Sequence, residues 1–376
     1  MKFSVNRNLF IDNLNNVMRA ISSRTTIPIL SGIKLNLTEN ELLLTGSDTD
    51  ISIEVRIPTS EDLTVESPGA IVLPARFFSE IIKKLPGKEF SLELKESMQT
   101  QIISENSEFT INGLDANNYP RLPEIADESA FVISGKTFRE IITETQFAVA
   151  TQESRQVLTG VHFTFSPEQI SAVATDSHRL SSRALSLTAG PQTETDLIIP
   201  GKSLLELARI IGETDPEIKV CPGDSQVLFE IGNMLFYSRL LEGSYPDTDR
   251  LIPTESTTSA EFDLAELSSA LDRASLLTHA GRNNVVDLTL DTEKQTVTLS
   301  GESAEIGNVE EEVSFKQLSG QNLKISFNPD YLRDALRASV TDSVVTEFTQ
   351  PLRPFTVNPA DNTINFVQLI TPVRTF

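Results

Sequence analysis

The chain has 376 residues, a net charge of −22 and a single cysteine, Cys221. Its length and ordinary apolar content predict two or three globular domains, and one cysteine excludes an intrachain disulfide. No segment reaches the roughly 18 apolar residues that a membrane span needs, and residues 1–6 lack the apolar core of a secretory signal. We therefore expect a soluble, cytoplasmic protein with no membrane partner.

Six segments have the three- and four-residue apolar spacing of amphipathic helices. In the first of them, Phe10, Leu14 and Val17 share one stripe with Leu9 and Ile21 beside it, and near the end of the chain Asn328 followed by Pro329 is a typical helix start. The predicted helices lie at residues 7–19, 75–85, 134–147, 201–211, 263–275 and 329–339.

The segments between these helices favour short strands. Residues 33–37 and 161–165 alternate apolar with polar side chains, which is typical of a strand with one buried face and one exposed face. Helices that alternate with such strands predict an α+β fold in which helices pack on one side of an antiparallel sheet.

The pattern repeats three times. Gly32 and Asp48 reappear 128 positions later as Gly160 and Asp176, and a third, weaker copy begins near Phe262. A period of this length exceeds that of solenoid repeats and suits a whole domain with its own core. We predict three domains, each with two helices and about eight strands, at residues 1–126, 127–254 and 255–376.

The charge is unevenly distributed along the chain. The six predicted helices hold 12 basic and 10 acidic residues, so the rest of the chain carries a net charge of −24. A strongly acidic total argues against phosphate binding, but one basic surface is sufficient for it. A mixed-charge helix face of an ordinary soluble protein explains the same counts.

Three similar domains joined at a constant angle would curve, and two chains meeting head to tail could close that curve. Twelve helices lining the inside at about 8 to 10 Å spacing give a circumference on the order of 100 to 120 Å. After helix radii of about 5 Å are removed, an opening of roughly 20 to 30 Å remains, which is wide enough for duplex DNA.

Five segments resemble the bacterial DNA polymerase III beta subunit, the sliding clamp, and together they extend over the whole chain. They are MKFSV at residues 1–5 with Arg24 and residues 27–30, LPAR at 73–76, ATDSHRL at 174–180, YPD at 245–247 and LITPVR at 369–374. Singly these are modest signals, whereas their order and distances are highly specific.

The resemblance implies three tandem DNA-clamp domains of the processivity fold and a head-to-tail homodimeric ring around duplex DNA. Such a ring binds DNA topologically and without sequence specificity, and it keeps the replicative DNA polymerase on its template. Its other implied partners are an ATP-driven clamp loader, and further polymerases and repair factors that carry short peptide motifs. It implies no catalysis and no cofactor.

The resemblance also implies a set of DNA-facing residues, most of which are cationic, as sequence-independent phosphate contact requires. They are Arg24, Arg76, Gln152, Arg155 and Lys202. Beside Arg155 stand Gln156 and Val157 in place of the aromatic residues that clamps can carry there, so no stacking contribution is expected. For each cation taken alone, a solvated surface charge is the alternative interpretation.

A peptide-binding pocket between the second and third domains is implied in the same way. Its residues are Leu158, Thr175, His178, Arg179, Leu180, Pro246, Arg250, Leu251, Leu369, Ile370, Pro372, Val373 and Arg374. Apolar side chains would form the floor, and the arginines would orient the backbone or carboxylate of a peptide that carries Gln with Leu or Phe. Leu158 and Leu180 could equally be core residues, and the chain end could be a last edge strand.

The dimer interface is the third implied site. The resemblance places the strand around Phe109 and Ile111 of the first domain against Leu276 and Leu277 in the third domain of the partner chain. An open sheet edge invites such pairing. The alternative interpretation is an internal strand of one domain's sheet.

We expect no catalytic residue and no metal site. Asp176, Ser177 and His178 include hydrolase residue types, but no G-x-S-x-G motif surrounds Ser177, and three histidines offer few ligands. Two other functions stay open at this stage. They are an acidic scaffold built from repeats that never encircles DNA, and an enzyme that no phosphate-binding or nucleophile motif supports.

Overall fold

The computed structural model describes residues 1–22, 24–280 and 284–374. It divides into two compact units, of which one holds Met1–Lys136 with Glu206–Leu240 and the other Thr137–Leu205 with Leu241–Phe376. The middle repeat is therefore shared between the units. Among the described residues, no helix combines the length and the apolar character that crossing a bilayer requires.

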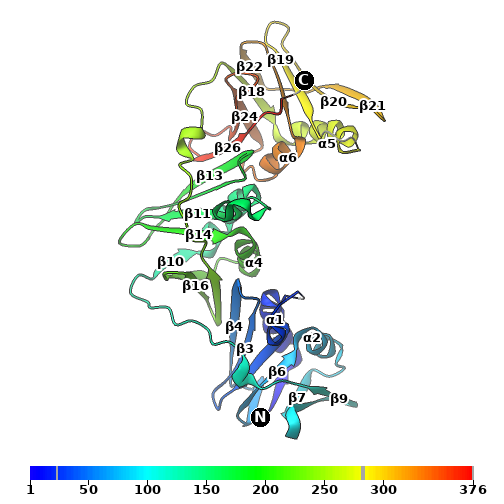
Figure 1. Ribbon diagram of the computed structural model, residues 1–376, viewed down its shortest axis with the longest axis vertical. Coiled ribbons are helices and arrows are strands. Elements are labelled where there is room, and N and C mark those ends of the chain that lie inside the picture. The colour runs from blue at the N-terminus through cyan, green and yellow to red at the C-terminus, as the bar shows by residue number, and fades with distance from the viewer. Residues whose placement is uncertain (23, 281–283, 375–376) are drawn as a thin grey trace. The chain divides into compact units, whose positions relative to one another are not determined.

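All six predicted helices are present. Figure 1 labels α1, α2, α4, α5 and α6. They are α1 (Arg7–Val17), α2 (Ala75–Lys84), α3 (Gly135–Thr145), α4 (Gly201–Ile211), α5 (Leu264–Ala280) and α6 (Pro329–Arg337). The side chain of Asn6 caps α1 by accepting from the backbone amides of Asn8 and Leu9, and Asn328 caps α6 as predicted. Helix α5 runs five residues beyond its predicted end, because residues 276–280 contain no glycine or proline.

Two sheets lie in the first unit, and both are antiparallel. The smaller has the order β5 (Leu63–Ser67), β1 (Lys2–Asn6), β7 (Glu89–Leu94), β8 (Gln99–Ser104) and β9 (Ser107–Asn112). The larger has the order β10 (Phe131–Ser134), β15 (Glu217–Pro222), β16 (Gln226–Ile231), β17 (Met234–Arg239), β4 (Ile51–Pro58), β3 (Glu41–Ser47), β2 (Gly32–Leu37) and β6 (Gly69–Pro74).

The second unit also has two antiparallel sheets. The larger has the order β14 (Thr195–Pro200), β11 (Gly160–Phe165), β12 (Gln169–Thr175), β13 (Arg179–Ser186), β26 (Phe366–Ile370), β25 (Phe355–Pro359), β24 (Ser343–Phe348), β18 (Thr258–Asp263) and β22 (Gln317–Gly320). The smaller has the order β21 (Gly307–Glu312), β20 (Thr296–Ser303), β19 (Val286–Asp291) and β23 (Leu323–Phe327).

Consecutive repeats are joined edge to edge by one strand pair each. In the first unit β17 pairs with β4, with Phe236 opposite Ile53. In the second unit β26 pairs with β13, with Leu369 opposite Leu180. In both cases the last strand of one repeat pairs with a strand of the preceding repeat. That strand is the third one after the first helix of the preceding repeat. The junctions are therefore continuous sheet.

Aromatic side chains fill the space between helices and sheets. In the first repeat the Phe10 ring meets Phe78 and Phe90 edge-on, at centroid distances of 5.8 and 5.1 Å. In the third repeat α5 and α6 pack on a buried cluster that includes Phe262 and Phe327. Burying each such side chain contributes roughly 1.5 to 3 kcal/mol, so the helices are held on the sheets mainly by their apolar stripes.

Candidate functional site

A cavity of about 420 Å³ lies in the second unit, between the segment that follows α3, the turn between β12 and β13, and α6. Leu158 and His178 from the predicted peptide pocket line it, and so do Gln152 and Arg155 from the predicted DNA-facing set. Tyr331 of α6 completes the wall. Two sets of residues to which the resemblance gave different roles therefore meet at one cavity.

The turn between β12 and β13 is shaped by one carboxylate. Oδ1 of Asp176 accepts from the backbone amides of His178 at 2.9 Å and Arg179 at 3.0 Å. Such a turn tolerates left-handed backbone, and Ser177 has a φ of 77°. The turn leaves His178 exposed, with its ring stacked on Tyr331 at 6.3 Å between centroids.

Arg179 is held rigidly beside the cavity. Its Nε donates to Asp176 Oδ2 at 3.1 Å, and a second nitrogen pairs with Asp334 of α6. The guanidinium also lies over the rings of Phe147 and Tyr331, at 5.5 and 4.9 Å from their centroids. Only 13% of its side chain is exposed. Arg179 therefore mainly positions the rings of Phe147 and Tyr331, and it presents little of its guanidinium to a ligand.

The remaining predicted pocket residues form a buried group and an exposed group. Those at or under the β13·β26 junction are Thr175, Leu180, Leu369 and Ile370, all buried, and the partly buried Pro372 and Val373. The tail is fixed there, because the backbone amide of Thr371 donates to the carbonyl of His178 at 2.9 Å. The exposed group is Pro246, Arg250, Leu251 and Arg374.

Tyr245 anchors the loop that carries part of the exposed group. Its hydroxyl accepts from the backbone amide of Thr175 at 3.1 Å, and its ring stacks on His162 at 5.2 Å. Burial raises the pKa of this phenol well above its ordinary value, so it stays protonated. Within the loop, Arg250 pairs with Asp247 at 2.7 Å.

Sequence reasoning missed Tyr331, Phe147 and Asp334. Tyr331 and Asp334 reach the site from α6, and Phe147 from the short 3-10 helix Gln146–Ala148 after α3. Asp334 lies 155 positions from its partner Arg179. No local pattern marks such contacts, because these side chains also suit ordinary amphipathic helices. Asp176 did carry a signal, since it repeats Asp48, and both act as turn residues.

The predicted DNA-facing residues are all exposed. Arg24 lies in the loop after α1, Arg76 and Lys202 are the second residues of α2 and α4, and Gln152 and Arg155 lie on the segment before β11. Arg76 contacts Glu80 at 3.4 Å with 86% of its side chain exposed. An ion pair of that kind contributes little, so its charge remains available to a polyanion.

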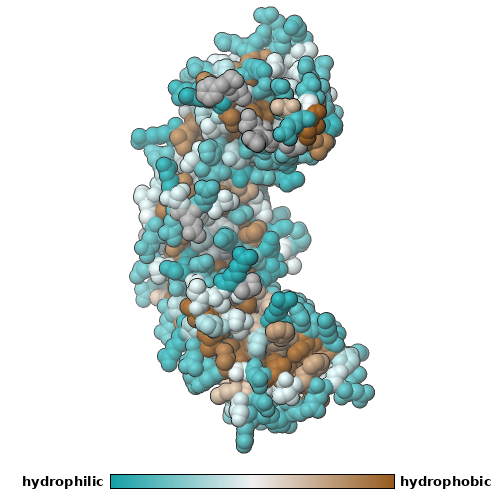
Figure 2. Space-filling model, turned by 45° about the vertical axis from the view of Figure 1, so that its right-hand side comes forward, coloured by the Kyte–Doolittle hydropathy of each residue, from teal (hydrophilic) through white to brown (hydrophobic). Residues whose placement is uncertain are grey.

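The predicted interface residues lie on the edge strand β9 in the first repeat and on helix α5, which packs against the edge strand β21, in the third. Strand β9, which carries Phe109 and Ile111, ends the five-stranded sheet, and β21 ends the four-stranded sheet. Phe109 is 39% exposed, and Leu276 of α5 is 70% exposed. Ile111 and Leu277 are partly buried. Hydrophobic side chains gather on the surface of the first repeat (Figure 2).

One group of side chains among the described residues has the proximity of metal ligands, namely Asp127, Cys221 and Glu230. The ammonium of Lys219 already lies 2.8 Å from Asp127 and 3.1 Å from Glu230. Burial raises the pKa of the Cys221 thiol to about 12. A protonated thiol beside a lysine is a poor metal site, and we assign it no metal.

A buried ion pair at the second junction predicts a pH effect. Glu144 of α3 pairs with Arg183 of β13 at 2.6 Å, and burial raises the pKa of Glu144 from 4.5 to about 7. Between these two pKa values the folded chain holds a proton that the unfolded chain has lost. The contribution of Glu144 to stability therefore falls as the pH rises from the unfolded pKa through the folded one. Relative to E144Q, the wild-type midpoint of thermal unfolding should fall between pH 5 and 8. Parallel pH profiles would contradict this assignment.

Comparison with known proteins identifies the class. Models of the DNA polymerase III beta subunit match in three parts, with the N-terminal domain at residues 1–123, the central domain at 132–247 and the C-terminal domain at 249–374. The beta sliding clamp of Staphylococcus epidermidis is 46% identical over 380 residues, and that of Staphylococcus aureus 45% over 381, each alignment covering all of both chains.

Solved structures agree with the sequence relatives. The DNA polymerase sliding clamp from Bacillus subtilis superposes over the full length of both chains with a TM-score of 0.96 and 43% identity. The beta subunit from Streptococcus pyogenes gives 0.95 and 42%, also over both full lengths. The fold is thus that of the sliding clamps, which are non-catalytic. The chain belongs to the DNA polymerase III beta subunit family.

Proposed function

We propose that two copies of this chain associate head to tail into a ring that encircles duplex DNA and tethers the replicative DNA polymerase to it. The observation that carries the proposal is a pair of complementary open edges. Strands β9, β17 and β26 are the last strands of the three repeats. Strands β4, β13 and β21 are each the third strand after the first helix of their repeat. Within the chain β17 pairs with β4 and β26 with β13, which leaves β9 and β21 for each other in two different copies.

The two internal junctions also supply a register for the third. Residues 234–238 run opposite 51–55, and residues 366–370 run opposite 179–183. Transferring that register places residues 107–111 opposite 307–311 of the partner copy. Phe109 would then face Val309, an apolar pair on the side of the sheet that the helices cover. Two such seams close a ring of six repeats, and no junction edge is left open.

The domains of this ring are residues 1–126, 127–254 and 255–376. Its bore would present Arg24, Arg76, Gln152, Arg155 and Lys202 to the DNA backbone. Few, exchangeable phosphate contacts allow sliding, because none of them reads a base. The strongly acidic remainder of the surface would discourage DNA from binding outside the ring. This function implies a cytoplasmic location and an ATP-driven loader that opens the ring.

The cavity beside Tyr331 is the proposed site of partner capture. Leu158 and His178 line it, and the tail after β26 runs next to it, because the backbone amide of Thr371 donates to the carbonyl of His178. An extended peptide with Gln and Leu or Phe suits such a groove, since its apolar side chains find pockets and its backbone finds polar groups. The replicative polymerase, other polymerases and repair factors would share it.

The lining residues predict a salt-sensitive effect. R24A/K202A should shorten residence on DNA at low salt and flatten the dependence of log affinity on log salt, by roughly 0.9 for each phosphate that is no longer neutralised. Filter binding across a salt series measures this slope. K294A, which changes an exposed lysine in the turn after β19, is the matched control. A double variant that behaves like K294A would remove both residues from the DNA-facing set.

A topological experiment tests the function itself. The protein is loaded with a clamp loader and ATP onto nicked circular DNA, separated from free protein by gel filtration, and then treated with a nuclease that cuts the circle once. A ring should stay on the circle at moderate salt and leave after the cut. An acidic scaffold that never encircles DNA would be lost from both forms alike, and that result would contradict the proposal.

A further inference from the structure

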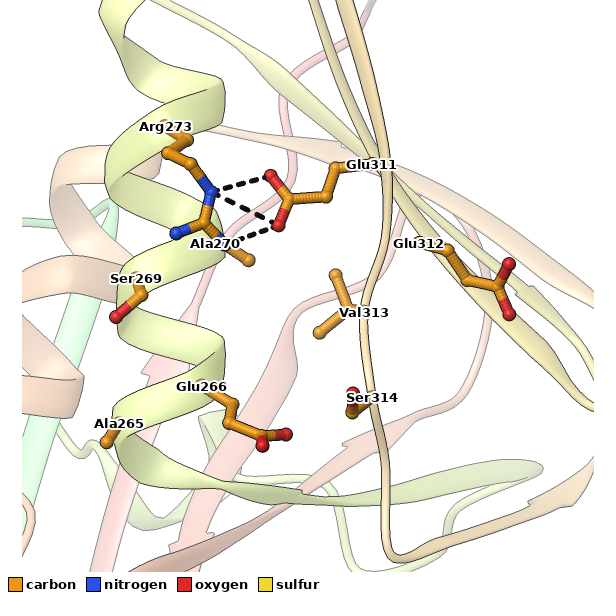
Figure 3. A pocket seen from close by; sticks show the side chains of 9 residues that line it. All are labelled: Ala265, Glu266, Ser269, Ala270, Arg273, Glu311, Glu312, Val313 and Ser314. Carbon is orange, nitrogen blue, oxygen red and sulfur yellow. Dashed lines mark hydrogen bonds and ion pairs between the residues drawn. The ribbon is translucent and has the colours of Figure 1, made fainter.

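A second cavity, of about 370 Å³, lies between α5 and β21 in the third repeat (Figure 3). Arg273 of α5 and Glu311 of β21 point toward one another across it. Nε of Arg273 lies 3.2 and 2.9 Å from the two carboxylate oxygens, and a second guanidinium nitrogen also bonds Glu311. The two side chains are 55% and 26% exposed, so this pair is largely in water.

The middle repeat has an ion pair at the same position with the opposite signs. Glu144 lies six residues after the buried Phe138, as Arg273 lies six residues after the buried Leu267. Arg183 and Glu311 are each the fifth residue of their strands, β13 and β21. The Arg183–Glu144 pair is 7% and 4% exposed. The burial differs because the next repeat covers the pair in the middle domain.

The cover comes from the turn before the junction strand. The carbonyl of Asn365, just before β26, accepts from Nη1 of Arg183 at 3.2 Å and from the backbone amide of Ala184 at 3.0 Å. At the first junction the carbonyl of Asn233, just before β17, accepts from the amide of Arg56 at 3.0 Å. Its side chain reaches α1 and donates to Asn13 at 3.1 Å.

The first repeat has the same residue before its unpaired strand. Asn106 directly precedes β9 and is exposed. We propose that the turn containing Asn106 inserts into the α5–β21 cavity of a second copy and covers the Arg273–Glu311 pair, so that this pair becomes a specificity determinant of the seam. The proposal rests on the head-to-tail association argued above. By the precedent of Ala184, the amide of Glu312 donates to the Asn106 carbonyl.

Covering the pair changes what a single substitution does. A charge that is buried after its partner has been removed is costly, whereas exchanging both members keeps the pair complete. In this chain the exchange has an internal precedent, because the middle repeat already uses the reversed order. Either reversal alone should therefore weaken the dimer, and both together should restore it.

Sedimentation of the full chain tests this inference. R273E and E311R should each raise the dimer dissociation constant by about tenfold or more, and R273E/E311R should return it to within about threefold of wild type. K294E, at an exposed ion pair elsewhere in the third repeat, makes the net charge more negative by two, as R273E does, and so controls for that change of charge. Single variants that match K294E, or a double variant as weak as the singles, would overturn the inference.

A cross-link provides a second readout if a charge reversal fails to fold. Ala270 of α5 lines the cavity that the Asn106 turn would enter. The variant carrying Asn106→Cys and Ala270→Cys should therefore form a covalent dimer on mild oxidation, and each single cysteine variant should not. Buried Cys221 does not compete, since its thiol stays protonated. If the wild-type chain dimerises but the double cysteine variant forms no cross-link, the inference about the Asn106 turn is overturned and the proposed ring is not. If the wild-type chain stays monomeric, the proposed ring is contradicted as well.

Discussion

Replacing Leu276 and Leu277 together with alanine should convert the dimer to monomers at micromolar concentration. A head-to-tail dimer has two identical seams, so each substitution acts twice on dissociation. Burying a leucine contributes roughly 1.5 to 3 kcal/mol, and even with a discount for the partly buried Leu277 the loss should exceed about 3 kcal/mol. That corresponds to more than about a hundredfold rise in the dissociation constant.

Analytical ultracentrifugation over a concentration series measures this change. L205A is the matched control, because Leu205 is a leucine on helix α4 with 38% of its surface exposed. It should leave the dimer intact. A double variant that dimerises as tightly as L205A would place the seam elsewhere than along α5 and β21.

Deleting residues 371–376 should weaken capture of a partner peptide by at least about thirtyfold, as expected when the core of a binding site is removed. The tail is part of the site's framework, because the amide of Thr371 bonds the carbonyl of His178 and the amide of Val373 bonds that of Ser326. The seam edges β9 and β21 are unaffected, so the dimer should remain.

Fluorescence polarisation with a labelled peptide carrying Gln and Leu or Phe measures capture, and sedimentation checks the dimer. L352A removes an exposed leucine from the loop between β24 and β25, and it should bind the peptide like wild type. Peptide affinity that survives the deletion would move the capture site away from the tail.

The helices could be predicted because their signal is local. Phe10, Leu14 and Val17 define a buried stripe without reference to any other segment, and Asn328 with Pro329 marks a start in the same way. The predicted end of α5 was wrong by five residues for a related reason. A helix end without a glycine or proline has no local sequence signal.

Strand partners across repeats could not be predicted in this way. The sequence GNVEEE of β21 lacks the apolar alternation of a buried strand, because β21 lies at the edge of its sheet and most of its side chains are exposed. The pairing of β17 with β4 and of β26 with β13 depends on how whole repeats meet. Once those pairs are known, the two remaining edges can be identified.

The site was predictable in part. The resemblance named His178 and Leu158, which do line one cavity, but it could not anticipate that Arg179 is held by Asp176 and Asp334. Charge pairing of this kind depends on α6 approaching β13 across 155 positions of sequence. The role of each site residue remains a prediction until its variant is measured.

The central claim is closure of two chains into one annulus, and electron microscopy combined with a solution mass tests it most directly. We predict a mass of twice one chain and particles with a central opening of roughly 20 to 30 Å. Monomers, or dimers without an opening, would contradict the account.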